Sequence, residues 1–358
     1  MRISSNMFYN HISQGLMDNL NELDTLSTQI ATGQKINKPS DDVLGTLKSM
    51  EYKLTISQNK QGQQNIIEAN NYLNFTSSVL TQVSNTIASL KKTTIQPEGT
   101  AQDQTYYSSQ AAALRDNLLD LSNSTYLNSY IFAGTLSDQK SYVYDATNHI
   151  YLYQGNSQQS SVSIGPGINL NSLNIIGNSP NGTTNTPFGY TLAAAATTTL
   201  PSGSVAVCTP DALTHPNSNT INVQITDSLT NVDNFSFSNI IDVANIISQA
   251  WIQKDVDGTA LTAQQSRDRI EVLGSTLDQF QNQLLVAQGQ IGINQVQLND
   301  QKTRLDTTTA TQENNLSEIQ DADLDKTIIS LQQIGTALNA LRSASSKILS
   351  QSLFDFLR

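Results

Sequence analysis

Residues 316–358, LSEIQDADLDKTIISLQQIGTALNALRSASSKILSQSLFDFLR, decide the fold of this chain because they carry a narrow apolar seam. The seam consists of two series with sevenfold spacing, Leu324, Leu331 and Leu338, and, three positions on, Ile334, Leu341 and Ile348. Asn, Gln, Ser and Thr fill most of the positions between them. This pattern is typical of a coiled-coil strand, which cannot bury its seam alone. We therefore predict a long helix that packs against another helix.

The beginning of the chain carries a matching seam. Its apolar residues are Leu16, Leu23 and Ile30 at sevenfold spacing, with Leu20 and Leu26 beside them. The pattern predicts a helix over residues 5–32, and Gly33 is suited to a left-handed cap at its end. A chain with two such ends is expected to bring them together or to place them against copies of itself.

A joint is predicted directly after this first helix. Residues 33–39 break the apolar periodicity, and Pro39 cannot continue a helix from within. Ser40 is placed as the N-cap of the next helix, with Asp41 and Asp42 in its first turn, where carboxylates meet the positive end of the helix dipole. We interpret Gly33, Pro39, Ser40, Asp41 and Asp42 as a hinge and helix cap.

The central part of the chain alternates long helical patterns with short β-rich runs. Sevenfold apolar rows predict helices over about 43–95, 102–128 and 262–323, and a shorter helix begins near residue 238 and ends with Trp251 as a packing anchor. Alternating runs predict strands at 142–144, 150–153, 162–164, 221–225 and 235–237, and the stretch 171–216 is rich in loop-forming residues.

The predicted fold class is therefore mainly α, with an inserted β domain and coiled-coil-like rods formed by both chain ends. The predicted divisions are 1–40 and 319–358 for the terminal coiled-coil domain, 41–132 and 256–318 for the helical rod domain, and 133–255 for the β-rich variable insert.

Composition limits the function of this 358-residue chain. Only 37% of the residues are hydrophobic and 6% aromatic, which argues against one large globular core. The net charge of -11 and the absence of a basic run argue against nucleic-acid binding. The single cysteine, Cys208, excludes an intramolecular disulfide. We find no signal-peptide pattern and no apolar run of membrane-spanning length, so we expect no membrane insertion.

The sequence offers no recognisable catalytic, cofactor or metal site. The three histidines are scattered, and none lies in a zinc-binding helix pattern. The series Asp321, Asp323 and Asp325 resembles the start of a calcium loop, but Lys326 replaces the required glycine and Gln332 the bidentate glutamate. We therefore expect no cofactor and no enzyme activity.

Five segments resemble the bacterial flagellin superfamily, and in particular its hook–filament junction branch. They are Met-Arg-Ile-Ser-Ser-Asn-Met at 1–7, Gly-Gln-Lys-Ile-Asn-Lys-Pro-Ser-Asp-Asp at 33–42, Tyr-Ile-Phe-Ala-Gly at 130–134, Ile-Gln-Asp-Ala-Asp-Leu at 319–324 and Leu-Phe-Asp-Phe-Leu-Arg at 353–358. Val43 departs from the proline that is common in this branch. The resemblance covers both helical ends, but the middle of the chain, about 135–250, has no specific match.

The resemblance implies a structural subunit of a tubular layer between hook and filament. It implies copies of the chain itself, hook-associated protein 1, flagellin and a flagellar export chaperone as partners, and an extracellular location in the flagellum after export without a cleaved signal peptide. The nearest alternative is a filament subunit, flagellin itself. A more distant alternative is a secreted adhesin that displays the β insert on coiled-coil arms.

The assembly interface is predicted on the two terminal seams. Its residues are Leu16, Leu20, Leu23, Leu26, Ile30, Leu324, Leu331, Ile334, Leu338, Leu341, Ile348, Leu353, Phe354, Phe356 and Leu357. Two lone helices bury only one seam each, and helices without tertiary packing are marginally stable. We therefore expect residues 1–40 and 319–358 to be mobile in the free monomer and to order on assembly.

Overall fold

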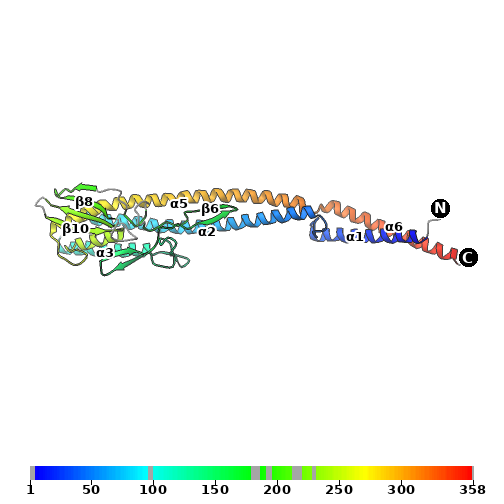
Figure 1. Cartoon of the computed structure of the whole chain (residues 1–358), viewed down its shortest axis with the longest axis horizontal. Helices are drawn as coiled ribbons and strands as arrows, with labels where there is room; N and C mark the ends of the chain where they lie inside the picture. Colours follow the sequence, from blue (N-terminus) through cyan, green and yellow to red (C-terminus); the bar gives the residue numbers. More distant parts are fainter. Residues whose placement is uncertain are drawn as a thin grey trace. The chain divides into compact units, whose positions relative to one another are not determined.

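The structure is a computed structural model that describes residues 5–95, 100–178, 186–190, 196–211, 220–227 and 231–356 (Figure 1). The chain divides into two compact units. The terminal unit contains residues 1–61 and 304–358, and the central unit contains residues 62–303. Two helices, α2 (Val43–Thr94) and α5 (Ala263–Gln320), contribute residues to both units.

In the terminal unit, helices from the two ends of the chain lie side by side. Helix α1 (Ser5–Thr32) packs along α6 (Leu324–Phe356), as Figure 1 shows. The predicted helix over 5–32 is thus confirmed. The seam-bearing helix begins at Leu324, because the chain leaves helical geometry between Gln320 and Leu324. The backbone N–H of Lys326 donates to the Asp323 carboxylate over 3.1 Å, which caps the new helix.

In the central unit, α2 and α5 bury apolar rows that repeat every seven residues. The rows on α2 contain residues that are 0–3% exposed, namely Ile66, Leu73, Leu80 and Ile87 in one and Ala69, Thr76, Val83 and Leu90 in the other. The matching residues of α5 are Leu277, Leu284, Ile291 and Leu298. Side-chain hydrogen bonds from Gln281 to Ser84 and from Gln295 to Asn74 hold the two helices in register. Sevenfold spacing thus produces the expected coiled-coil-like packing.

Helix α3 (Ala101–Ser122) begins with a capping box formed by Thr100 and Asp103, in which each side chain accepts from the other residue's backbone N–H. The predicted helix over 102–128 was wrong at its end. The chain instead turns through Leu127 and Asn128, both with positive φ, and forms a hairpin of β1 (Thr125–Tyr126) and β2 (Ser129–Tyr130). Asn tolerates this left-handed geometry, so local turn chemistry overrode the helical pattern.

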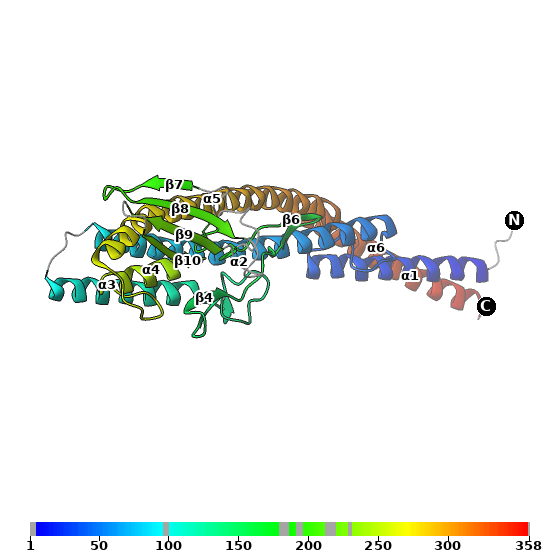
Figure 2. The same ribbon diagram turned by 60° about the vertical axis from the view of Figure 1, so that its left-hand side comes forward.

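The strands form short antiparallel hairpins and one larger sheet. The hairpins are β3 (Tyr142–Asp145) with β4 (Ile150–Tyr153), and β5 (Val162–Gly165) with β6 (Ile168–Leu170). The four-stranded sheet has the order β10-β9-β8-β7, with β7 (Ala196–Thr199), β8 (Val205–Asp211), β9 (Thr220–Thr226) and β10 (Val232–Phe237). Figure 2 shows this sheet beside α4 (Ile240–Ala250) and α5. All five predicted strands are confirmed, and β7 and β8 both lie within 171–216, the stretch predicted to form loops with occasional strand.

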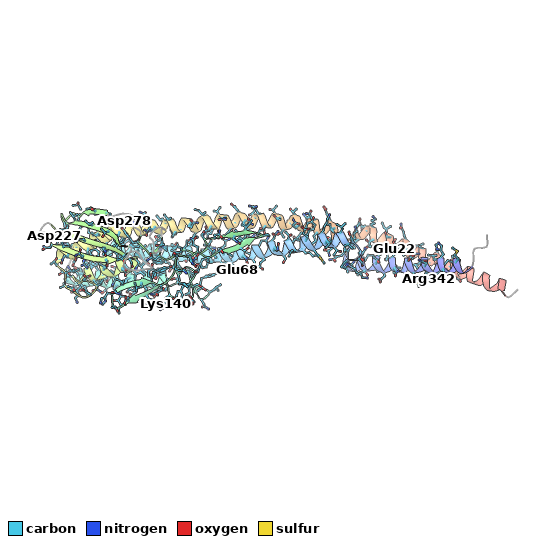
Figure 3. All side chains as sticks on the ribbon, in the orientation of Figure 1. Glu22, Glu68, Lys140, Asp227, Asp278 and Arg342 are labelled. Carbon is cyan, nitrogen blue, oxygen red and sulfur yellow. The ribbon has the colours of Figure 1, made fainter. Side chains whose placement is uncertain are left out.

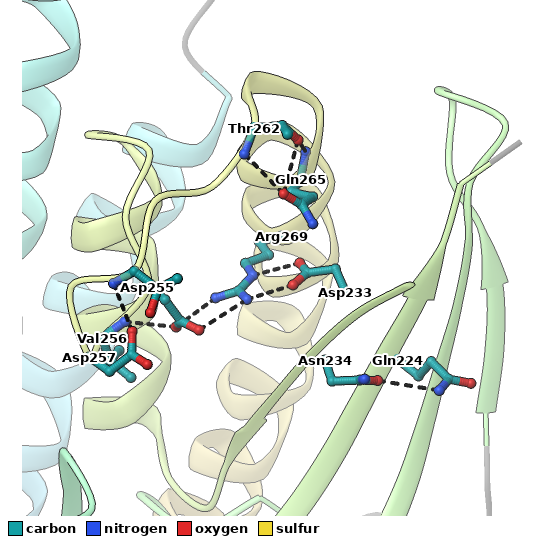
Figure 4. A network of polar contacts seen from close by, with 10 residues as sticks. Gln224, Asp233, Asn234, Asp255, Val256, Asp257, Thr262, Gln265 and Arg269 are labelled. Carbon is teal, nitrogen blue, oxygen red and sulfur yellow. Dashed lines mark hydrogen bonds and ion pairs between the residues drawn. The ribbon is translucent and has the colours of Figure 1, made fainter. Parts of the chain in front are cut away.

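Two buried polar clusters join strands to the helices of the central unit. At the start of α4, the Asp242 carboxylate accepts hydrogen bonds from the backbone N–H groups of Tyr151 and Ser238, over 2.7 and 3.0 Å. In the second cluster, Arg269 is 1% exposed and donates to both carboxylate oxygens of Asp233, over 2.6 and 2.7 Å, and to Asp255 over 2.8 Å (Figure 4). Buried charges require such pairing.

Two kinds of feature are missing from the part of the chain that the structure describes. None of the described helices combines the length and hydropathy needed to cross a membrane. Within the same residues, no group of three or more His, Cys, Asp or Glu side chains is arranged to hold a metal ion.

Candidate assembly surface

The predicted seam of the terminal unit is brought together, but it is only partly covered. On α6, Ile334 and Leu338 are 8% and 5% exposed, and Leu331 and Leu341 are half-buried. On α1, the half-buried members are Leu16, Leu23, Leu26 and Ile30. Leu20 and Leu324 remain 40% and 45% exposed. The α1–α6 pair therefore leaves part of its apolar surface open to further packing.

The remaining predicted interface residues cannot be assigned an environment. The side chains of Ile348, Leu353, Phe354 and Phe356, and all of Leu357, lie outside the described residues. Their place in the interface stays a prediction.

The joint after α1 has the predicted glycine cap but a different helix cap. Gly33 has a φ of +69°, and its N–H donates to Gln29 O over 2.9 Å, as expected of a left-handed helix end. The prediction of Ser40 as N-cap was wrong, because α2 begins at Val43. Asp42 is the capping residue, and its carboxylate accepts from Gly45 N–H over 2.9 Å.

The residues before this cap form a tight turn. Asp41 donates its N–H to Lys38 O over 2.9 Å, and Pro39 and Ser40 lie exposed in the turn between them. The Asp41 carboxylate accepts from the N–H groups of Asn37 and Lys38, over 3.1 and 2.8 Å. Asp41 therefore stabilises the turn and not the first turn of the helix.

The joint is also bonded to the break between α5 and α6. Lys35 N–H donates to Gln320 O over 2.7 Å, and Ala322 N–H donates to Gly33 O over 2.9 Å. The side chains of Gln320 and Gln34 form a further bond of 2.9 Å. Both helix interruptions of the terminal unit therefore lie at the same level and satisfy each other's backbone groups.

The first turns of α2 expose an apolar row that is not among the predicted interface residues. Its members are 58–70% exposed and are Val43, Leu44, Leu47, Met50 and Leu54. Positions 43, 47, 50 and 54 follow the i, i+4, i+7, i+11 spacing of one helix face. The spacing is visible in the sequence, but it does not indicate whether the rest of the chain covers this face. We call these five residues the α2 row.

Other large apolar side chains of the terminal unit are exposed as well. On α1 they are Met7 and Met17, at 70% and 63%, and on α6 they are Ile328 and Ile329, at 43% and 56%. A soluble monomer rarely exposes many large apolar side chains in one region, and such surfaces commonly mark protein–protein contacts. The terminal unit thus concentrates large apolar side chains that the described part of the chain leaves exposed.

Charged groups contribute little to this surface. Lys60 and Glu313 form an ion pair of 2.8 Å, but both side chains are about half exposed, so water and salt screen it. Glu22 and Arg342, labelled in Figure 3, are exposed on α1 and α6. The chemistry of the surface is therefore mainly apolar contact, with amides and hydroxyls between the apolar positions.

Comparisons with known proteins agree with this arrangement. Residues 3–137 match the family described as the bacterial flagellin N-terminal helical region. Over 138 residues, the chain is 31% identical to flagellar hook-associated protein 3 of Salmonella typhimurium and, to the same extent, of Escherichia coli. The aligned part covers 37% of this chain and 44% of each relative, so it spans less than half of the relatives' length.

Solved structures show the same fold. A putative flagellar hook-associated protein from Vibrio parahaemolyticus has a TM-score of 0.56 and 14% identity, with 78% of this chain and 100% of that chain covered. The flagellar hook-associated protein-3 of Legionella pneumophila has a TM-score of 0.54 and 18% identity, with 75% and 98% covered.

The N-terminal helices thus match the flagellin N-terminal helical region, and the fold is that of solved hook-associated proteins. Both curated relatives that the chain resembles over this region are hook-associated protein 3.

Proposed function

We propose that this chain is the structural subunit that forms the junction layer between the hook and the filament of the bacterial flagellum. The observation that carries this proposal is the open apolar surface of the terminal unit, made of the half-covered α1–α6 seam and the exposed α2 row. The likeness to hook-associated protein 3 over the N-terminal helices supports the same role.

Copies of the chain would complete this surface. The α1–α6 seam and the α2 row are different patches of one unit, so a contact that joins one patch to the other on the next copy is heterologous. Heterologous contacts generate rings or helical tubes and not closed dimers. A tubular layer is therefore the assembly that this surface favours.

A layer between hook and filament would have a neighbour on each side. Hook-associated protein 1 would adjoin the layer on the cell side, and flagellin would adjoin it on the distal side. A cytosolic chaperone would cover the apolar terminal helices before export, because an open seam of this kind promotes aggregation. The chain would then act outside the cell, exported without a cleaved signal peptide.

Electron microscopy of intact flagella tests the location. Gold-labelled antibody against residues 135–250 should mark one band where hook meets filament. Label along the whole filament would identify the chain as a flagellin, and label away from flagella would favour an adhesin; either result would overturn the proposal.

A pair of single substitutions tests the surface. Leu338→Asp places a carboxylate in the buried part of the seam and should abolish incorporation into flagella, while the central unit stays folded. Asn339→Asp introduces the same charge at the exposed neighbouring position and should leave incorporation unchanged. Normal incorporation of the Leu338→Asp variant would show that the seam is not an assembly surface.

A further inference from the structure

The central unit contains a cavity of about 600 Å³ that has no part in the proposed assembly. Its walls come from the end of α2, the start of α3, the turn after α4 and the first turns of α5. The volume is in the range of ordinary small-molecule sites, which span roughly 300–1,000 Å³.

One side of the cavity is apolar and anchored by the only tryptophan of the chain. Trp251, Ala250 and Ile270 line it and are 5%, 1% and 8% exposed. The ring of Tyr107 packs against the Trp251 indole with 4.9 Å between ring centroids, which fixes the indole in place. A ligand in this cavity therefore meets a rigid apolar wall.

The charged residues of the wall balance each other. Lys91 and Arg267 are basic, and Asp278 and Glu271 are acidic. Lys91 forms an ion pair with Asp278, which Figure 3 labels, and Arg267 donates to the Gln264 side chain over 2.7 Å. Burial and, to a smaller extent, the nearby charge of Asp268 raise the pKa of Glu271. A wall without excess charge gives no preference to an anion or a cation.

The uncharged polar groups supply both donors and acceptors. Gln104, Gln253 and the hydroxyls of Thr94 and Ser275 line the cavity. The Thr94 and Ser275 hydroxyls donate to carbonyls of their own helices over 2.8 and 2.7 Å, which leaves their oxygen lone pairs as acceptors.

Two buried polar atoms in the wall residues have no partner among the described residues. They are the Trp251 indole nitrogen, which can only donate, and the Ser266 hydroxyl, in a residue 5% exposed. Both atoms lie beneath the cavity surface, so the polar groups that a ligand meets are the amides, hydroxyls and charged groups described above.

We propose that this cavity binds an uncharged saccharide of one or two rings. Sugar hydroxyls donate and accept at once, so they match a wall that mixes carboxylates, cationic donors, amides and hydroxyls. The apolar face of a sugar ring suits the wall formed by Trp251 and Ile270, and the balanced charges favour a neutral ligand.

Because Trp251 is the only tryptophan, its indole N–H gives a single reporter signal in the ¹H–¹⁵N spectrum of the full chain. Maltose, cellobiose and N,N′-diacetylchitobiose are the probes, with butanol and urea as non-saccharide comparisons. We expect at least one disaccharide to shift the indole signal in a saturable way.

A cavity-filling variant provides the matched control. Ser275→Leu places a larger side chain in the wall and should weaken binding by about tenfold or more, while Ser57→Leu, at an exposed position of α2 away from the cavity, should bind as the wild type does.

Three results would overturn the proposal. They are no shift with any disaccharide, equal binding to the Ser275→Leu variant, or an equal response to butanol or urea. None of these results bears on the junction role, which the gold-label experiment tests separately.

Discussion

The central and terminal units use the same sevenfold spacing but close their apolar surfaces to different degrees. In the central unit, Leu73, Leu80, Leu277 and Leu284 are fully buried. In the terminal unit, most seam residues are half-buried, and the α2 row is 58–70% exposed. The central unit has additional layers, since the sheet and α4 lie beside α5 (Figure 2), whereas α1 and α6 pack mainly against each other among the described residues.

The terminal unit is also more polar inside. Asn59, Thr309 and Gln312 have buried side-chain atoms without a partner among the described residues. Asn59 and Gln312 extend the sevenfold rows of Ile66 on α2 and Leu298 on α5, where the central unit has apolar residues. Apolar periodicity alone therefore predicts helix pairing, but the residues at the paired positions decide whether the pair is stable by itself.

The largest effect on stability is expected in the central unit, from Arg269→Met. Burial disfavours the charge of Arg269, but hydrogen bonds with Asp233 and Asp255 outweigh this and raise its pKa. Removing the cation leaves the 7%-exposed Asp233 without a countercharge, which should lower the free energy of unfolding by about 3–5 kcal/mol. Urea unfolding followed by Trp251 fluorescence measures this change.

Arg342→Met is the matched control for this prediction. Arg342 is exposed on α6, so its replacement should change the unfolding free energy by less than about 0.5 kcal/mol. Equal small effects of both variants would show that the Arg269 cluster does not stabilise the central unit.

A smaller, pH-dependent effect is expected from Asp242→Asn. Burial raises the pKa of the Asp242 carboxyl to about 6, against the lowering effect of its hydrogen bonds from Tyr151 and Ser238. The folded state thus binds the proton more tightly, so the stabilisation is present below pH 4 and is lost as the pH rises through about 6. The loss between pH 4 and 7 is on the order of 2–3 kcal/mol.

The measurement is urea unfolding at several pH values for both chains. The variant should lack this part of the pH dependence, since its amide does not titrate in this range. Identical pH profiles for the two chains would mean that another group is responsible.

Leu338→Ala should destabilise the chain less than these substitutions, because Leu338 lies in the terminal unit, where the apolar seam is only partly covered. The side chain is 5% exposed, but its surroundings are half-open, so we expect a loss of about 1–2 kcal/mol that is confined to the α1–α6 pair. Hydrogen exchange should show faster exchange in α1 and α6, with no change in the central unit.

Leu277→Ala is the comparison. This side chain is fully buried in the central unit, so its truncation should lower the free energy of unfolding by about 2–5 kcal/mol. If Leu338→Ala lowered the stability of the central unit equally, the contrast between the two units would fail.

The smallest effect on the free chain is expected from Leu47→Gln in the α2 row. Leu47 is 61% exposed, so the substitution should change the unfolding free energy by less than about 0.5 kcal/mol. Sedimentation at increasing protein concentration should nevertheless show weaker self-association than in the wild type. Lys48→Gln, at the exposed neighbouring position, is the control and should associate normally.

Most of the helical framework was predictable, because sevenfold rows extend over many residues. The bounds of α1 and α2 and the hairpin of β3 and β4 agree with prediction to within one residue. The errors lie where a single residue decides the geometry: Asp42 caps α2 in place of Ser40, and Leu127 and Asn128 end the third helical pattern early. The predicted divisions at residues 40 and 319 remain predictions.

The assembly surface was predictable only in part. The spacing of apolar residues identifies the terminal seams. Whether the α2 row is exposed depends on which other segments pack against it, and the local sequence does not contain that information. The same holds for the cavity at Trp251, whose walls come from helices far apart in the sequence.

The bonded joint between Lys35 and Gln320 has a consequence for the order of folding. These residues are separated by almost the whole chain, so their hydrogen bond forms only after the intervening residues have been synthesised. Contacts of such high sequence separation form late, since the entropy of a long loop opposes them. The alignment of α1 with α6 is thus expected to be a late step of folding, after the central unit has formed its own contacts.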